Sequence, residues 1–532
     1  MKKILLFLSV TYMLVMAILP ACNNSSKTSF VLKGTLSGIK EGKIIMSSVY
    51  NEGIKPDTAI IKDGKFIFSG NISESDIFPP MYTLGIEDGK SYRAYFYPEN
   101  SEMTLIGHAD SLAEAIIKGG KIQDDYNIIN KQKSLITKKY NIAELRKEFF
   151  LPAIPENRRT ELRNIMSKCD EEIRALDPTF IKENPASEYS AILIEQLSTG
   201  KSADEIESEI AALDPKLATT PTVLRLRANI DKMKQTEVGI GNIITEAHNL
   251  SYEVDKKFSG SEHKDIIYLS VLSDNTLCAL KQDATVKLIT SEGKESKSFK
   301  AELPKEASTI ATDIDDNIYV LGTFYEKVKQ NVRGKVYERN MPKGTKCVVY
   351  DKKGVKKNEL KLFDVSMVTG ARVVEKKIVV ADFHKRIVAI FDANTGELIS
   401  KIPNMRVCCG ILDLSINSNN QILVANLGAF RVNCYDFSGK SIFAFGKRGN
   451  GIDDFHGCCN PVSVAFLSNG GIVTVEKGPT RIKVYSKEGA KKVEGIEELV
   501  KGCVYIPMAV DTKDNVYLAS KASGLVKCVP KK

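Results

Sequence analysis

The stretch that decides the fold is Cys409–Tyr435, with the sequence CGILDLSINSNNQILVANLGAFRVNCY. It aligns without gaps to Cys459–Tyr485, CNPVSVAFLSNGGIVTVEKGPTRIKVY, and to Cys503–Val529, CVYIPMAVDTKDNVYLASKASGLVKCV. In each copy a cysteine lies 13 residues before an apolar residue that opens a strand-like run, and the copy ends 13 residues later. This register predicts three copies of one structural unit.

Each copy contains short strand-like runs separated by turns, followed by a polar turn with glycine such as Tyr435–Gly439. Earlier copies end at residues 289–293, 350–354 and 391–396, which gives six units. A single sheet of this kind cannot bury both of its faces, whereas sheets arranged around a channel can. We therefore predict a six-bladed β-propeller over residues 251–532. A strand at residues 251–258 completes the truncated last unit.

Two motifs within these units point to a known repeat. Phe445–Gly451 (FGKRGNG), followed by Phe455 and Pro461, resembles the signature of NHL repeats, and so does Thr480–Tyr485 (TRIKVY). The resemblance implies the six-bladed propeller fold. It does not imply one function, because propellers include binding modules, lyases and hydrolases.

The region before the propeller has two other patterns. Residues 29–120 contain short β-rich runs, with a hairpin signal at Asp63-Gly64, and predict a small antiparallel β domain. Residues 121–237 have helical periodicity and capping-box spacing at Ser202 and Glu205, and residues 238–250 form a linker. The predicted fold class is therefore mainly β with an α-helical middle region.

Several short motifs in this region resemble a family of domains of unknown function: Phe30–Gly34, Asp57-Thr58, Asp63–Phe66, Pro98–Asn100, Asn184–Ser187 and Leu213–Pro215. In that family the domain precedes a thioredoxin-like domain in envelope thiol/disulfide oxidoreductases. Here the predicted propeller stands in the place of the thioredoxin-like domain, and the sequence contains no Cys-x-x-Cys motif. The resemblance therefore implies the cell envelope as the compartment. It does not imply redox activity, because the expected motif is missing.

The first residues predict export and a lipid anchor. Lys2 and Lys3 precede an uncharged apolar run over residues 4–19, and Leu19–Cys22 (LPAC) resembles a bacterial lipobox. We expect a signal peptide at 1–21, a lipid on Cys22 and a tether at 22–28, so that the membrane is one partner. Because no acidic residue follows Cys22 in the tether, we expect a periplasm-facing protein of a Gram-negative cell envelope. An ordinary signal peptide is the alternative.

Net charge and missing motifs count against several classes of function. The 75 basic and 66 acidic residues give a net charge of +9, a mild excess for 532 residues, so no nucleic-acid partner is expected. No phosphate loop or nucleophile elbow is present. We expect a non-catalytic propeller whose face binds a protein or small ligand. The alternatives are a metal-dependent lyase or hydrolase, and a protein that handles thiols or soft metals with the cysteines at the channel mouth. A basic hairpin at residues 323–346 either binds an anionic partner or is simply solvated.

The cysteines form the one unusual group. Five of them and a histidine come just before the first strand of three consecutive units, and are predicted to converge at one mouth of the channel: Cys408, Cys409, His456, Cys458, Cys459 and Cys503. Disulfides between blades, a soft-metal site and thiol exchange are the three interpretations. No cofactor is expected unless Cys409, Cys459, Cys503 and His456 bind copper or zinc.

A second polar set repeats at the end of each unit's second strand. Asp382, Asn426 and Glu476 occupy equivalent positions, with His384 beside Asp382. We place this set at the opposite mouth of the channel, and turn capping is the alternative role. Arg431 and Arg481 also repeat and are expected to form hydrogen bonds between blades.

Overall fold

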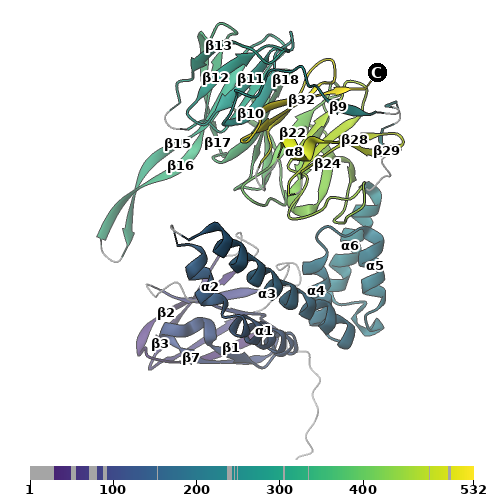
Figure 1. Cartoon of the computed structure of the whole chain (residues 1–532). Coiled ribbons are helices and arrows are strands. Elements are labelled where there is room, and N and C mark those ends of the chain that lie inside the picture. Colours follow the sequence, from purple (N-terminus) through teal and green to yellow (C-terminus); the bar gives the residue numbers. More distant parts are fainter. Residues whose placement is uncertain are drawn as a thin grey trace, which may run out of the picture. The chain divides into compact units, whose positions relative to one another are not determined.

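A computed structural model of the chain describes residues 29–531, apart from 50–54, 71–80, 88–92, 152–153, 237–242, 245, 248–249, 304–305, 333–334, 479 and 501–504. The chain forms two compact units, residues 1–177 and 178–532 (Figure 1). The division falls inside the region that the sequence predicts to be helical.

The first unit contains an eight-stranded sheet in the order β6-β5-β2-β3-β4-β1-β7-β8. Buried and exposed residues alternate along β4, where Phe66 and Phe68 point into the core. Asp63 and Gly64 form the predicted turn before β4 with φ of 51° and 72°, in the left-handed region that such hairpins require. The strands are β1 (Phe30–Ser37), β2 (Glu41–Ser48), β3 (Asp57–Lys62), β4 (Lys65–Gly70), β5 (Tyr82–Ile86), β6 (Ala94–Phe96), β7 (Glu102–His108) and β8 (Ile116–Lys118).

The helical region spans the division between the units. In the second unit, α4 is buried over Tyr189–Glu195, and α5 begins with the predicted capping box of Ser202 and Glu205. Among the described residues, no helix is long and apolar enough to span a membrane. The helices before the propeller are η1 (Ala109–Glu114), α1 (Lys121–Lys139), α2 (Ile142–Phe149), α3 (Glu156–Glu183), α4 (Glu188–Leu197), α5 (Ala203–Ala211), η2 (Pro215–Leu217) and α6 (Pro221–Thr236).

Six four-stranded sheets follow and confirm the predicted propeller. Within each of blades 1–5 the chain runs through four consecutive antiparallel strands. Blades 1 and 2 are β10 (Ile266–Val271), β11 (Leu277–Lys281), β12 (Thr285–Ile289), β13 (Glu295–Lys300), and β14 (Thr309–Thr312), β15 (Ile318–Val332), β16 (Lys335–Tyr350), β17 (Lys356–Phe363). Blade 3 is β18 (Val368–Val374), β19 (Lys377–Asp382), β20 (Ile387–Asp392), β21 (Leu398–Ile402).

Blades 4 and 5 repeat the same order of strands. They are β22 (Asp413–Ile416), β23 (Ile422–Asn426), β24 (Arg431–Tyr435), β25 (Ser441–Phe445), and β26 (Ser463–Phe466), β27 (Ile472–Glu476), β28 (Arg481–Ser486), β29 (Gly489–Lys492). The short helices η3 (Leu427–Ala429) and α8 (Ile496–Leu499) lie in connections.

The last blade closes the ring with a strand from the start of the propeller. It combines β30 (Met508–Val510), β31 (Val516–Ser520), β32 (Gly524–Pro530) and β9 (Tyr252–Val254). Pro530 pairs with Tyr252 and Cys528 with Val254 in an antiparallel register. The predicted completion of the truncated unit is therefore confirmed.

The helices of the second unit pack against blade 4. The Arg448 amide donates to the Gly200 carbonyl at 2.7 Å, and Arg406 Nη1 donates to Thr199 Oγ1 at 2.7 Å. Arg431 Nη2 donates to the Lys201 carbonyl at 3.1 Å. These bonds hold the turn between α4 and α5 against blade 4, on the side of the blade where β22 begins.

In blade 2 the predicted basic hairpin is built by β15 and β16, which pair as far as Val332 and Lys335. It projects from the propeller as a long two-stranded arm (Figure 1). Two of its lysines lie near acidic residues on the paired strand, with Lys327 Nζ 3.8 Å from Glu338 and Lys343 Nζ 3.6 Å from Glu326.

Candidate functional site

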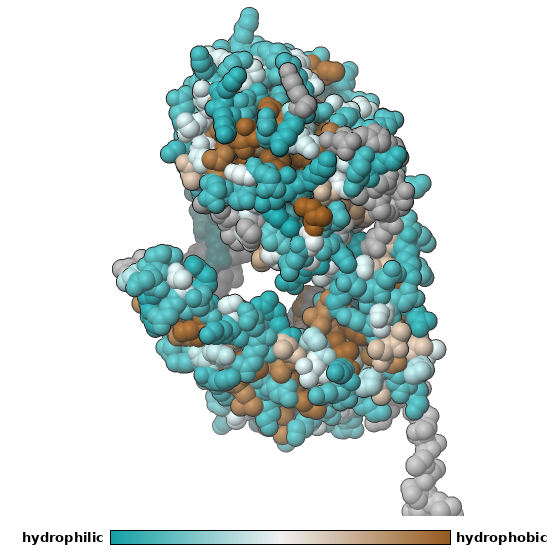
Figure 2. Space-filling model, turned by 45° about the vertical axis from the view of Figure 1, so that its right-hand side comes forward, coloured by the Kyte–Doolittle hydropathy of each residue, from teal (hydrophilic) through white to brown (hydrophobic). Residues whose placement is uncertain are grey.

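A cavity of about 520 Å³ lies at the mouth of the channel where the innermost strands begin. Its lining comes from five of the six blades and is mainly apolar, including Ile266, Thr369, Ile411, Tyr505, Pro507 and Lys521. Elsewhere on the propeller, the visible surface is largely hydrophilic, with hydrophobic residues gathered in local groups (Figure 2). The cavity itself is a mainly apolar recess with a few polar groups, the usual form of a ligand site.

A polar network joins three blades beside this cavity. Tyr268 Oη donates to Asp413 Oδ1 at 2.6 Å, and Arg372 Nη1 donates to Tyr268 Oη at 2.8 Å. The ring of Tyr505, which lines the cavity, stacks on Tyr268 with centroids 5.9 Å apart. Burial raises the pKa of the Asp413 carboxyl, although the charge of Arg372 acts in the opposite direction.

The two adjacent-cysteine loops that lead into β22 and β26 share one backbone feature. The second cysteine of each loop is left-handed, with φ of 55° at Cys409 and 57° at Cys459. A disulfide joins Cys408 to Cys459 across blades 4 and 5, with their Cα atoms 6.2 Å apart. The structure thus contains a disulfide between neighbouring blades, which is one of the three interpretations of the cysteine group.

Two free thiols flank this disulfide. Cys409 Sγ lies 3.4 Å from Cys408 Sγ, and Cys458 Sγ lies 3.7 Å from Cys459 Sγ; both free cysteines are exposed. The ammonium group of Lys477, whose residue is only 1% exposed, lies 3.2 Å from Cys409 Sγ. The sulfurs of Cys408, Cys458 and Cys459 all lie within 4.8 Å of one another. This spacing is suitable for a metal ion or for disulfide exchange.

The other described cysteines have a different environment. Cys169, Cys278, Cys347, Cys434 and Cys528 are free and buried. Burial raises the pKa of Cys434 and of Cys528 to about 12, so these thiols stay protonated and packed at neutral pH. Among the described residues, the accessible thiols are those at the channel mouth.

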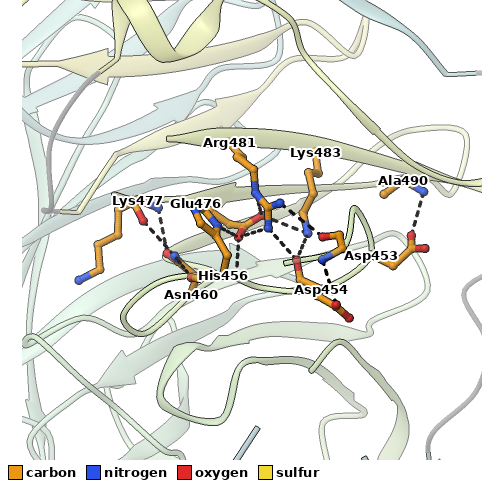
Figure 3. Close-up of polar contacts among 10 residues, drawn as sticks. Asp453, Asp454, His456, Asn460, Glu476, Lys477, Arg481, Lys483 and Ala490 are labelled. Carbon is orange, nitrogen blue, oxygen red and sulfur yellow. Dashed lines mark hydrogen bonds and ion pairs between the residues drawn. The ribbon is translucent and has the colours of Figure 1, made fainter. Parts of the chain in front are cut away.

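A buried charge cluster lies next to the second cysteine loop (Figure 3). Glu476 is fully buried at the end of β27, where its carboxylate lies 2.8 Å from Arg481 Nη2 and 3.0 Å from Lys483 Nζ. His456 Nδ1 lies 2.6 Å from the same carboxylate, and the His456 amide donates to it at 3.0 Å. The side chain of Lys477 points away from this cluster.

Charges and donors decide the ionisation of Glu476. Burial works against both charges of the Glu476–Lys483 pair, and it lowers the pKa of Lys483 to about 8. For Glu476 burial is outweighed by Lys483, by Arg481 and by the two bonds from His456, so the pKa of this carboxyl is lowered. Glu476 is therefore an ionised structural centre of blade 5.

The predicted placement of Asp382, Asn426 and Glu476 at the opposite mouth is wrong. The His456 amide donates to Glu476 and the Arg406 amide to Asn426, so both acceptors lie beside the loops that carry the cysteines. The reason is antiparallel pairing, which brings the end of each second strand back to the start of the first. Asp382 accepts from the amides of Ser366, Met367, His384 and Lys385.

Arg431 and Arg481 were predicted to form hydrogen bonds between blades, but the contacts that the structure describes for them are different. Arg431 donates to the Lys201 carbonyl, which belongs to the turn before α5. Arg481 donates to Glu476 on the paired strand of its own blade, and to the Asp454 carbonyl in the loop that leads into that blade.

The predicted metal set is only partly brought together. His456 is directed at Glu476 by its Nδ1 atom, and Cys409 contacts Lys477. His384 is exposed on its loop. Cys503 and the predicted lipidation site Cys22 lie outside the described residues. Within the described part, the sulfurs that cluster are those of Cys408, Cys458 and Cys459.

Sequence reasoning missed the residues that surround the thiols and the cavity. Lys477 and Lys483 belong to a residue type that is usually exposed, yet both are buried here. Arg481 and Lys483 are two residues apart on the strand that pairs with the strand of Glu476. This spacing was the sequence signal that could have predicted the ion pairs. Tyr268, Arg372 and Asp413 carried no signal, because each lies in a different blade.

Comparisons with known proteins bear on the first β domain and on the propeller. Residues 30–126 match a domain of unknown function, DUF4369, in agreement with the resemblance noted over the first β domain. No curated protein matches the chain. Among solved structures, the chain is similar to one described as a streptogramin B lyase structure, with 9% identity and a TM-score of 0.36, over 53% of this chain and 98% of that one.

Proposed function

We propose that this protein is a lipid-anchored, periplasm-facing protein of a Gram-negative cell envelope. On this proposal its propeller binds a protein partner or small ligand at the channel mouth without catalysis. The observation that carries the binding role is the cavity of about 520 Å³ beside Tyr505 and Lys521. A recess of this volume accommodates a small ligand or an inserted side-chain group of a partner.

Binding is favoured over catalysis by the distribution of charge around the cavity. Its lining is mainly apolar, with Lys521 as its charged member. The ionisable groups of the inner strands nearby are paired with one another: Tyr268 bonds to both Asp413 and Arg372. Such paired groups hold the inner strands together and leave the recess itself apolar.

The test places a photo-crosslinking residue in the cavity. Benzoylphenylalanine replaces Lys521 in the full-length chain, and cells are irradiated before the protein is purified and its mass measured. We expect an adduct of defined mass. The matched control is the same replacement at Lys353, in a turn after β16 that does not line the cavity. Absence of an adduct at position 521, or equal adducts at both positions, would refute binding in the cavity.

The anchor is tested separately. The positive start, the apolar run and the LPAC sequence before Cys22 support lipidation. Radioactive palmitate should label the full-length protein and should not label the Cys22→Ser variant. The Cys22→Ser variant should also be lost from the membrane fraction. A Cys22→Ser protein that is still labelled would place the lipid elsewhere.

A further inference from the structure

We infer that the mouth of the channel is a redox-gated site for a soft monovalent metal, Cu(I), with the thiolates of Cys408, Cys458 and Cys459 as ligands. This inference does not depend on what the cavity binds. It rests on three sulfurs from two neighbouring blades that lie within 4.8 Å of one another. A metal bound at about 2.3 Å to three sulfurs in one plane requires them about 4.0 Å apart, so small side-chain movements are sufficient.

The loops hold the cysteines in place independently of the disulfide. The Ile411 amide donates to the Cys408 carbonyl at 3.1 Å. In the second loop, the Asn460 side chain donates to the carbonyls of His456 and Lys477, and accepts from the Lys477 amide at 2.9 Å. Because these bonds involve no sulfur, reduction should leave the three thiols facing one another.

The disulfide is the gate. In the oxidised form Cys408 and Cys459 are bonded to each other, so Cys458 alone of the three can offer a thiolate. A dithiol reductant transfers two electrons and two protons to the disulfide, becoming a disulfide itself, and two protein thiols form. Three thiols then bind one Cu(I) ion and release three protons, which gives a complex of net charge −2. Exposed Cys458 provides the route of entry.

The chemistry of the surroundings suits this ion. Thiolates are soft ligands that favour Cu(I), whereas a structural zinc site usually has four protein ligands. The charge of the complex has a nearby counterion in Lys477, whose ammonium group lies 3.2 Å from Cys409 Sγ, itself 3.4 Å from Cys408 Sγ. Cys409 is the neighbour of the ligand set and is not a member of it.

The experiment is an anaerobic competition. The full-length chain in detergent, either untreated or reduced with dithiothreitol that is then removed, is titrated with Cu(I) held by bathocuproine disulfonate. The fall in absorbance of the copper chelate reports transfer to the protein. Reduced protein should take up one Cu(I) per chain more than the untreated protein at the same chelator concentration. Equal uptake by the two forms would overturn the redox gate.

Two variants test the ligand set. Cys458→Ser changes an exposed residue and keeps both members of the disulfide, so its fold is protected; after reduction it should bind the gated Cu(I) at least tenfold more weakly. Cys409→Ser removes the neighbouring exposed thiol and should bind within threefold of the wild type. If Cys458→Ser competes as well as the wild type, or if Cys409→Ser loses affinity equally, this ligand set is wrong.

Discussion

Blades 4 and 5 have nearly the same backbone pattern and stabilise it by different means. Their second and third strands align at an offset of 50 residues, so Asn426 corresponds to Glu476 and Asn433 to Lys483. In blade 4 the two asparagines form a neutral hydrogen bond of 3.1 Å, whereas in blade 5 the pair is ionic at 3.0 Å and fully buried. In both blades the first residue of the pair accepts from a backbone amide of the preceding loop.

The equivalent arginines of the two blades, Arg431 and Arg481, have different partners. Arg431 of blade 4 is directed outwards to Lys201 and docks the helices. Arg481 of blade 5 is directed to Glu476 and completes a charge cluster inside the blade. One scaffold therefore supports a docking surface in blade 4 and an internal charge cluster beside the thiol loop in blade 5.

The largest expected effect comes from removing the central carboxylate of blade 5. Glu476→Ala leaves Lys483 buried without a counterion and should lower the free energy of unfolding by about 3–5 kcal/mol. Asn426→Ala, the matched change in blade 4, removes neutral hydrogen bonds and should cost about 1–2 kcal/mol. Because the chain has no tryptophan, urea unfolding should be followed by near-ultraviolet circular dichroism of tyrosine.

A double variant sharpens the same comparison. Glu476→Asn with Lys483→Asn gives blade 5 the neutral pair of blade 4, so it should be less destabilised than Glu476→Ala alone. Together with the single changes Glu476→Asn and Lys483→Asn, the double variant completes a cycle that gives the coupling energy of the pair. If the double variant is less stable than Glu476→Ala, the two blades are not interchangeable at this position.

The next effect concerns a second buried carboxylate, on the helical side of the docking contact. Glu195 in α4 is 3% exposed, and burial raises its pKa to about 7, since Arg225 at 3.4 Å compensates only in part. Glu476 has several close partners, and its pKa is lowered. The direction of each shift therefore follows from the number of cationic partners and donors around the carboxylate.

This contrast gives a pH dependence of opposite sign. Because the folded protein keeps the Glu195 proton to a higher pH than the unfolded chain does, its contribution to stability is complete below about pH 4.3 and is lost as the pH rises to about 7. Glu195→Gln should therefore match the wild type near pH 4 and be more stable by about 3–4 kcal/mol at pH 8. Urea unfolding at both pH values measures this, and an equal difference at the two pH values would contradict it.

The blades could be predicted from the sequence, whereas the contacts between the blades could be predicted only in part. The gap-free repeat defined blades 4 to 6, and strand-and-turn patterns supplied the rest, including closure by β9. The prediction that Asp382, Asn426 and Glu476 lie at the opposite mouth was wrong, because it ignored that antiparallel pairing returns the end of the second strand to the start of the first. The Tyr268–Arg372–Asp413 network could not be predicted, since its members are 104 and 145 residues apart in sequence and meet only when the ring closes.

The smallest effect tests the docking role of blade 4. Arg431→Ala removes the guanidinium bond to the Lys201 carbonyl and should cost about 1 kcal/mol. The effect should be local: amide hydrogen exchange should accelerate in residues 199–203, while strands β23 and β24 keep their protection. Lys447→Ala is the control, because Lys447 lies 3.9 Å from Glu205 with both side chains nearly half exposed, and such pairs contribute about 0–1 kcal/mol. If Lys447→Ala accelerates exchange at 199–203 as much as Arg431→Ala does, general charge attraction rather than the directed bond holds the helices against blade 4.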